Sequence, residues 1–285
     1  MAILMDGKAT GAKVRARLAE KTVEFKEKYG YAPGLAVIIV GDDPASKVYV
    51  RNKKKACEEV GYNSFEYALP AETTEEELLE LIAKLNADKS VHGILVQSPV
   101  PKHIDEKKIQ LNILPEKDVD AFHPVNVGKI MIGDYDFVPC TPAGITELLD
   151  EYGIETNGKS CVVIGRSNIV GKPMAMLMLH KNCTVTICHS KTPDVGAVTR
   201  EADIVIAAVG KADFLKGDMI KEGAVVIDVG MNRNAEGKLC GDANFEECEK
   251  KASYITPVPG GVGPMTITML MKNTLKSAEL FANRD

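Results

Sequence analysis

A lysine and a tyrosine one helical turn apart are the first candidates for chemistry in this chain. Residues 46–55 read Ser-Lys-Val-Tyr-Val-Arg-Asn-Lys-Lys-Lys. At about 100° per residue, Tyr49 and Lys53 share a helical stripe with Ala56 and Val60. Burial lowers the pKa of a lysine, which lets it carry protons near neutral pH. A solvated basic face, with the charged end reaching water, is the alternative interpretation.

Two polar residues stand where apolar runs end. Gln97 closes the run 94–96, ahead of the proline-rich break 98–101, and Asp120 lies in the segment 115–124. Open parallel sheets place their sites at the carboxyl ends of strands and in the loops that follow. Taken alone, each residue is more typical of a loop or a helix cap, so each is a candidate only in combination with Lys53.

A stiff glycine-proline segment lies near the carboxyl end of the chain. Residues 257–266 read Pro-Val-Pro-Gly-Gly-Val-Gly-Pro-Met-Thr, between an apolar run and a helix expected from Met265. Glycine lets a backbone approach a ligand closely, and proline holds the loop rigid. The segment predicts a site for a planar or anionic ligand, with a rigid turn that binds nothing as the alternative.

A second glycine turn indicates a dinucleotide. Gly165 ends the apolar run 161–164, Gly171 stands where a helix must approach the sheet, and Pro173 fits the first helical turn. Backbone donors there would face a phosphate. The spacing differs from Gly-x-Gly-x-x-Gly, so a purely structural turn in another α/β protein stays open.

The end of the next strand bears on the choice between NAD and NADP. An NAD site usually carries an acid there for the ribose hydroxyl, but residues 188–192 read Cys-His-Ser-Lys-Thr. Arg166, His189, Ser190 and Lys191 can donate to a 2′-phosphate that a carboxylate would repel. The pattern favours NADP, against the alternative of a solvated polar loop.

Composition narrows the class of protein. The chain has 285 residues, 45% of them hydrophobic, and a net charge of -5, which gives no indication of a nucleic-acid partner. It has no run long and apolar enough for a membrane span, and its first residues do not form a signal peptide. The seven scattered cysteines and five histidines predict reduced thiols in a cytoplasmic protein without a metal site.

The elements that must position these residues alternate between strand and helix. Short apolar strands separated by helices predict an α/β protein with parallel sheets and helices on both faces. The irregular segment 102–142 divides the chain, so we expect one α/β domain over 1–140, completed by a C-terminal helix 266–285. We expect a second, Rossmann-like domain over 141–265. The expected elements are helices over 8–28, 46–60, 74–87 and 173–180, and strands over 35–40, 65–69, 94–97, 160–164, 184–188, 204–209, 225–229 and 254–256.

Together these segments resemble the bifunctional methylenetetrahydrofolate dehydrogenase/cyclohydrolase family over nearly the whole chain. The resemblance implies a homodimer with a folate cleft between two α/β domains. It assigns catalysis to Lys53, pterin positioning to Tyr49, tuning of the lysine to Gln97 and pterin binding to Asp120. It places Pro259, Gly260 and Gly261 in the folate site. The NADP site that it implies comprises Gly165, Arg166, Ser167, Gly171, His189, Ser190 and Thr192. The motifs that carry it are 49–53, 96–101, 117–120, 165–173 and 257–266.

The implied activity is oxidation of 5,10-methylenetetrahydrofolate with NADP, followed by hydrolysis of the methenyl product to 10-formyltetrahydrofolate, without a metal. A single-activity relative, another NADP dehydrogenase, and a non-catalytic folate or nucleotide-binding module are the alternatives. The chain departs from the family at Ala121, where glycine is usual, and at Ser98 and Val100, where leucines are common. Positive φ at Ala121 would strain the backbone.

Overall fold

A computed structural model of the chain describes residues 1–284, which fall into two compact units. We name them by their main sheets. The six-stranded unit comprises Met1–Gly11 and Thr141–Thr266. The three-stranded unit comprises Ala12–Cys140 and the stretch from Ile267 onwards.

The first eleven residues belong to the six-stranded unit, which corrects the expected first domain over 1–140. Strand β1 (Ile3–Leu4) pairs in parallel with β11 (Tyr254–Ile255). The Ile3 amide donates to Ser253 O at 2.8 Å, and the Met5 amide donates to Ile255 O at 2.8 Å. Two residues of strand carry too little periodicity to be recognised, because their partner lies about 250 residues away in the chain.

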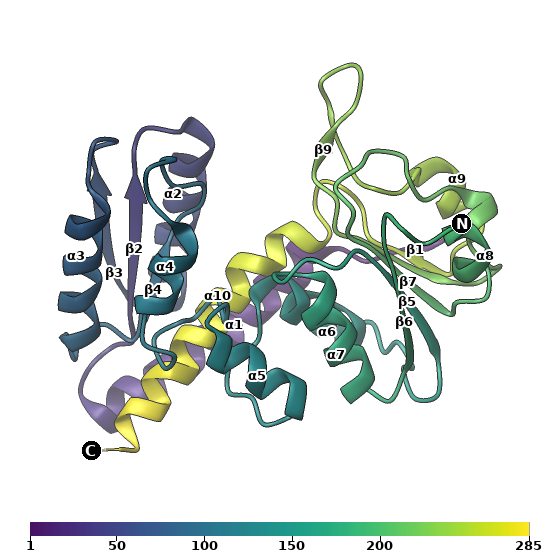
Figure 1. Cartoon of the computed structure of the whole chain (residues 1–285). Coiled ribbons are helices and arrows are strands. Elements are labelled where there is room, and N and C mark those ends of the chain that lie inside the picture. The colour runs from purple at the N-terminus through teal and green to yellow at the C-terminus, as the bar shows by residue number, and fades with distance from the viewer. Residues whose placement is uncertain (285) are drawn as a thin grey trace. The chain divides into compact units, whose positions relative to one another are not determined.

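The three-stranded unit contains a parallel sheet whose strands lie in the order β3-β2-β4 (Figure 1). Its central strand is buried along its whole length, as its continuous apolar sequence predicts. Side chains on one face pack on α3 and α4, while α2 packs against the first two strands. The strands are β2 (Gly34–Val40), β3 (Asn63–Leu69) and β4 (Gly93–Val96), and the helices are α1 (Gly7–Tyr29), α2 (Pro44–Val60), α3 (Glu75–Ala87), α4 (Glu106–Asn112), α5 (Pro124–Ile132) and α10 (Val262–Ala282).

Local chemistry sets the ends of the helix that carries Lys53. The Asp43 carboxylate accepts the Ser46 amide at 2.7 Å, and Pro44 occupies the first turn of α2. The helix therefore begins two residues before the predicted Ser46. Gly61 ends it in the left-handed conformation, with φ 80°.

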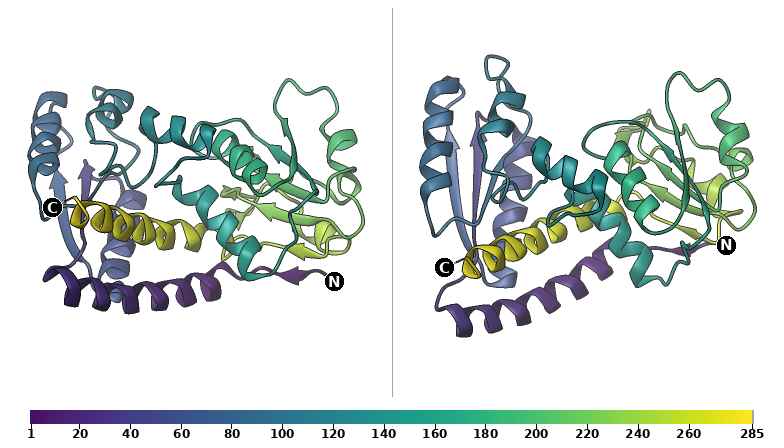
Figure 2. Two further views of the ribbon diagram at one scale, coloured as in Figure 1. Left: turned by 90° about the horizontal axis from the view of Figure 1, so that it is seen from below. Right: turned by 60° about the horizontal axis from the view of Figure 1, so that its bottom comes forward.

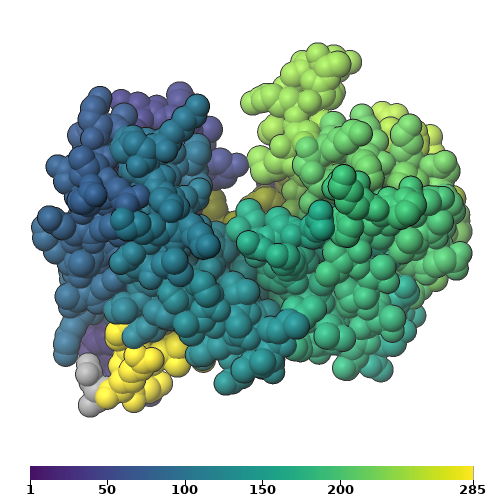
Figure 3. All heavy atoms as spheres, in the orientation of Figure 1, coloured from purple at the N-terminus to yellow at the C-terminus, as the bar shows by residue number. Residues whose placement is uncertain are grey.

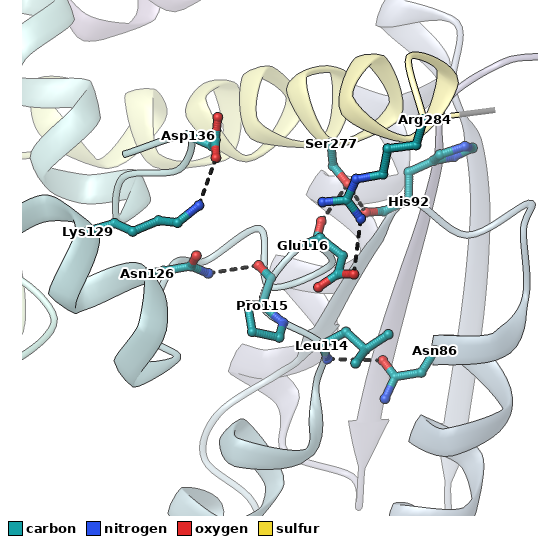
Figure 4. A network of polar contacts seen from close by, with 10 residues as sticks. All are labelled: Asn86, His92, Leu114, Pro115, Glu116, Asn126, Lys129, Asp136, Ser277 and Arg284. Carbon is teal, nitrogen blue, oxygen red and sulfur yellow. Dashed lines mark hydrogen bonds and ion pairs between the residues drawn. The ribbon is translucent and has the colours of Figure 1, made fainter. Parts of the chain in front are cut away.

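Helix α10 secures the irregular segment that leads to Asp120. Ser277 Oγ donates to His92 O at 2.5 Å and to Glu116 O at 2.7 Å (Figure 4). Within this unit α1 and α10 lie side by side, and the Arg15 guanidinium donates to Thr268 Oγ1 at 2.7 Å (Figure 2). The segment 102–142 holds only α4 and α5 as helices before α6 (Cys140–Glu151) begins at its end, in agreement with the irregular, largely loop-like segment that we expected.

The six-stranded unit is a parallel sheet in the order β1-β11-β8-β7-β5-β6. Chain order reverses between β5 and β7, because β6 lies on one side of β5 and β7 on the other. A short antiparallel hairpin, β9 with β10, stands out from this unit (Figure 3). The remaining strands are β5 (Ser160–Ile164), β6 (Thr184–Cys188), β7 (Ile204–Ala207), β8 (Val225–Asp228), β9 (Asn232–Arg233) and β10 (Leu239–Cys240). The helices are α6 (Cys140–Glu151), α7 (Gly171–His180), α8 (Val195–Thr199), α9 (Phe245–Glu249) and the 3₁₀ helix η1 (Gly217–Met219).

Two general features agree with the composition. All seven cysteines are free thiols. Among residues 1–284, no helix combines the length and the apolar character that a bilayer crossing needs.

Candidate active site

Lys53 and Gln97 meet in the three-stranded unit. The Lys53 side chain is only 8% exposed, and its Nζ donates to Gln97 Oε1 at 2.5 Å. Gln97 follows β4 directly, and its backbone amide donates to Ile38 O at 2.8 Å. Its Nε2 donates to Ser98 O at 2.7 Å, so the amide group presents its oxygen to the lysine.

The charge state of Lys53 depends on two more groups of the same unit. Burial lowers the pKa of Lys53, while the charges of Asp120 and Cys140 act to raise it. Burial also raises the pKa of Asp120 to about 6, although the Lys53 charge acts to lower it. The two groups therefore stabilise each other's charged form, and the cluster can exchange protons near neutral pH.

The hydrogen bond to Gln97 does not by itself favour the neutral form of Lys53. A carbonyl oxygen accepts a stronger hydrogen bond from an ammonium than from a neutral amine. This contact alone would therefore raise the pKa of Lys53 rather than depress it. Burial causes the lowering, and Gln97 orients the nitrogen.

Tyr49 does not share the burial of Lys53, contrary to its expected place on an apolar stripe. Its side chain is 41% exposed, whereas Val50 and Cys57 are buried on the same helix. The buried face of α2 keeps Lys53, Ala56 and Val60 and extends on one side to Val50 and Cys57, so its centre is rotated by roughly 40° from the predicted stripe. Tyr49 lies at the border of this face, where an exposed ring can meet a planar ligand.

Two residues that the sequence did not single out hold Asp120. The Cys140 thiol lies 3.6 Å from Asp120 Oδ1 and 3.5 Å from Val119 O. Asn273 Nδ2 donates to Val119 O at 2.8 Å and to Val138 O at 2.9 Å. Both contacts join residues far apart in sequence, and the only signal was the Pro-Cys-Thr-Pro segment 139–142.

The three residues that depart from the family pattern lie in different surroundings. Ala121 is fully buried and adopts φ 59°, the left-handed conformation that glycine tolerates best. Ser98 is exposed, and its hydroxyl donates to the Glu106 carboxylate. Val100 packs against the core between the sheet and α3. The strained position is therefore the one next to Asp120.

The turn after β5 has the shape of a phosphate cradle. Gly165 adopts φ 134°, and a Cβ on Gly171 would lie 2.3 Å from Gly165 O. Only glycine fits at both positions. Ser167 Oγ accepts the amides of Val170 and Gly171 at 3.2 and 3.3 Å, and α7 begins at Gly171. Residues 166–169 are exposed beside this helix N-terminus, which fits the anionic bridge of a dinucleotide.

The turn after β6 adjoins this cradle. The Gly165 amide donates to Cys188 O at 2.8 Å, which ties the two strand ends together. The His189 amide donates to Thr192 Oγ1 at 3.0 Å, so residues 189–192 form a closed turn. Arg166 and Ser190 are exposed. Two turns with basic and hydroxyl side chains thus border the carboxyl end of β5.

The glycine-proline segment is shorter as a loop than its sequence predicts. Helix α10 begins at Val262, so only residues 257–261 are loop, and Pro264 lies in the first helical turn. Gly260 has φ 112°, and its carbonyl accepts the Gly7 amide at 2.9 Å. A Cβ on Gly7 would lie 1.7 Å from Gly261 O, which makes the contact specific to glycine.

The candidate residues thus fall into two groups. Tyr49, Lys53, Gln97 and Asp120 belong to the three-stranded unit. Pro259, Gly260 and Gly261 belong to the six-stranded unit, together with Gly165, Arg166, Ser167, Gly171, His189, Ser190 and Thr192.

Comparison with known proteins identifies both halves of the chain. Residues 5–120 match the tetrahydrofolate dehydrogenase/cyclohydrolase catalytic domain, and residues 139–282 match the NAD(P)-binding domain of the same family. Bifunctional protein FolD of Acetivibrio thermocellus is 62% identical over 279 residues, covering 98% of both chains. Its counterpart from Bacillus pumilus is 59% identical over 278 residues, again covering 98% of both.

Solved structures agree with this result. The FolD enzyme of Campylobacter jejuni is 53% identical and superposes with a TM-score of 0.95, covering 100% of both chains. The Trypanosoma brucei enzyme, solved with NADP and an inhibitor, is 42% identical with a TM-score of 0.92 and 98% coverage of both chains. A glycine cradle, a buried lysine and these likenesses along the whole chain lead to one assignment. The chain belongs to the tetrahydrofolate dehydrogenase/cyclohydrolase family.

Proposed function

We propose that the six-stranded unit binds NADP and that the Lys53 cluster carries the proton transfers of folate chemistry. The chain is a methylenetetrahydrofolate dehydrogenase and methenyltetrahydrofolate cyclohydrolase that uses NADP. It oxidises 5,10-methylenetetrahydrofolate and then hydrolyses the methenyl product to 10-formyltetrahydrofolate. The single observation that carries the residue assignment is the buried 2.5 Å contact between Lys53 Nζ and Gln97 Oε1.

The cofactor site that we propose lies at the turns after β5 and β6. When bound there, NADP would supply the acceptor for the hydride of the methylene carbon. The turn between Gly165 and Gly171 would hold the bridging phosphates, because it leads into the N-terminus of α7, where a helix favours an anion. Arg166 and the 189–192 turn would hold the 2′-phosphate by charge-assisted hydrogen bonds.

The hydrolytic step requires a group that takes a proton from water and returns it. In the neutral form that burial favours, Lys53 can accept a proton as water adds to the methenyl carbon. The same group, now an ammonium, can deliver that proton to the ring nitrogen that leaves when the bridge opens, while the hydroxyl on the former methenyl carbon releases its own proton to solvent and becomes the formyl oxygen. Gln97 keeps Nζ in one place through both transfers.

We propose folate-binding roles for Asp120, Tyr49 and the segment 259–261. Asp120 would bind donors of the pterin ring, since its oxygens accept and Cys140 fixes one of them. Tyr49 offers an exposed aromatic face for the same ring. Pro259, Gly260 and Gly261 would supply close backbone contact to folate. We further propose that the enzyme works as a cytoplasmic homodimer, which sedimentation and fractionation would check.

Replacement of Lys53 by methionine tests the assignment. Lys53→Met removes the proton carrier but fills the same volume, so it should abolish hydrolysis of methenyltetrahydrofolate while the folate still binds. Lys54→Met is the matched control, because Lys54 is exposed and pairs with Glu66 at 2.9 Å. Near-normal hydrolysis by Lys53→Met would refute the role. If the unsubstituted enzyme shows only one of the two activities, the chain is instead a single-activity relative.

A further inference from the structure

Asp242 carries a fully buried carboxylate whose two oxygens accept four hydrogen bonds. Its Oδ2 accepts the amides of Val209 and Gly210 at 2.6 and 3.0 Å. Its Oδ1 accepts the Lys211 amide at 2.9 Å and Asn232 Nδ2 at 2.9 Å. Three consecutive amides of one loop therefore converge on a single side chain. A carboxylate suits this environment because it accepts at both oxygens and donates at neither.

The loop that Asp242 holds lies next to the glycine cradle. It follows β7, and its first residue, Ala208, donates its amide to Ile164 O at 2.8 Å. A Cβ on Gly165 would lie 2.3 Å from Ala208 O, so the loop and the cradle are in direct contact. Strands β5 and β7 are the neighbours between which chain order reverses (Figure 1). Ligands of open parallel sheets lie outside the carboxyl ends of strands at this reversal.

The position of Asp242 is itself fixed by a second buried carboxylate. Asp228 ends β8, and its Oδ1 accepts the amides of Asp242 and Gly230 at 2.8 and 2.9 Å. A Cβ on Gly241 would lie 1.8 Å from Asp228 Oδ2, and one on Gly230 would lie 2.4 Å from Asp242 Oδ1. The chain closes around the two carboxylates so tightly that glycine is required on both sides. Hydrogen bonds to its backbone amide and to both carboxylate oxygens hold Asp242 in this orientation.

We propose that Asp242 is a positioning residue for NADP. It fixes the backbone of residues 208–211, which forms one wall of the cofactor site. The inference rests on the proposed placement of NADP at Gly165. Asp242 touches neither the cofactor nor the folate. The wall that it fixes is backbone, and the one charged side chain of the loop, Lys211, has its Nζ over the Phe214 ring. The effect of Asp242 should therefore reach the part of the cofactor that NADP and NAD share.

The test is Asp242→Asn, which preserves shape but directs an NH₂ group at backbone donors. Losing charge-assisted bonds to the loop should raise the KM and Kd of NADP by roughly tenfold or more, and those of NAD equally. Calorimetry gives Kd without turnover. Hydrogen exchange at the amides of residues 209–211 should accelerate. Hydrolysis of methenyltetrahydrofolate without added cofactor should keep its rate, which also reports that the folate site is intact.

Asp203→Asn is the matched control. Asp203 precedes β7 and accepts the Ser160 amide at 2.9 Å, so it anchors the same sheet at the opposite ends of its strands. The control should reduce stability but leave the affinity for NADP unchanged. If it weakens NADP binding as much as Asp242→Asn does, the effect is general destabilisation and the proposal is wrong. Unchanged affinity and unchanged exchange in Asp242→Asn would overturn it as well.

A milder variant covers the case in which Asp242→Asn does not fold. Asn232→Ala removes one of the four donors to the carboxylate, so it should produce the same effects at a smaller size. No rise in Kd in that variant would count against the positioning role. Failure of the unsubstituted enzyme to bind NADP would refute the proposed function itself, which separates the two hypotheses.

Discussion

Lys53 Nζ lies 2.5 Å from Gln97 Oε1, a contact that joins the middle of α2 to the residue following β4. The first prediction concerns a charge placed at this contact. Gln97→Glu would set a carboxylate beside Lys53 and raise the pKa of the lysine. At a given pH, Lys53 would then be uncharged in a smaller fraction of the molecules. Cyclohydrolase activity at neutral pH should therefore fall roughly tenfold or more. The pH–rate profile should move to higher pH. Gln97→Ala adds no charge, so an equal movement there would contradict the explanation.

Arg166 should discriminate between the two nicotinamide cofactors. Arg166→Ala removes one charge-assisted contact to the 2′-phosphate, which is typically worth about 1.5–3 kcal/mol. The KM for NADP should therefore rise roughly tenfold or more, with the KM for NAD nearly unchanged. Equal damage to both cofactors would show that Arg166 supports the turn rather than the phosphate. Asp242→Asn, by contrast, is expected to affect both alike.

Ala121 offers a measure of backbone strain beside Asp120. Ala121→Gly relieves about 1–2 kcal/mol of left-handed strain, but loses a buried methyl and adds freedom to the unfolded chain. The free energy of unfolding should therefore change by less than about 1 kcal/mol. Ala278→Gly, at a buried position in α10, lacks the relief and should cost about 1–2 kcal/mol more. Urea unfolding of both variants checks the difference, and equal losses would argue against strain at Ala121.

His92 should make stability depend on pH below neutrality. Burial lowers the pKa of His92 to about 4, from about 6.5 in an unfolded chain. The unfolded state then binds more protons than the folded state, so stability falls as the pH falls and levels off below about 4. Between pH 7 and pH 5 the contribution amounts to about 2 kcal/mol of unfolding free energy.

His92→Asn isolates this contribution. An asparagine oxygen can replace Nδ1, which accepts the Gly34 amide at 3.0 Å, but it does not titrate. The variant loses the stacking on Tyr31 and should be less stable at every pH. Its stability should nevertheless decline less steeply from pH 7 to pH 5. A decline as steep as that of the unsubstituted protein would place the titration elsewhere.

Much of the sheet framework could be predicted from the sequence, because its strands are continuous apolar runs. Residues 160–164 and 184–188 form β5 and β6 with the predicted limits. The buried lysine was also predictable, since helical periodicity placed Lys53 among apolar neighbours. Tyr49 was wrongly expected to be buried, because helical periodicity does not define how wide the buried stripe is. The packing of α2 on the sheet decides which edge of the stripe is covered.

What the sequence could not reveal depends on partners distant in the chain. The contacts of Asn273 to residues 119 and 138 have no local pattern, and neither has the pairing of β1 with β11. Helix α10 starts earlier than expected because prolines and glycines that look like a loop are accepted in a first turn. In each case tertiary structure overrides the local preference.

The way the chain divides between the units has a consequence for its synthesis. Residues 1–11 can join a sheet only after β11 has been synthesised. The segment around Asp120 likewise needs Asn273 and Ser277, which are synthesised near the end of the chain. A nascent chain on the ribosome can therefore complete neither unit until almost all of it has emerged. Cutting the gene between the matched domains, near residue 140, would leave each fragment without a part that the other carries.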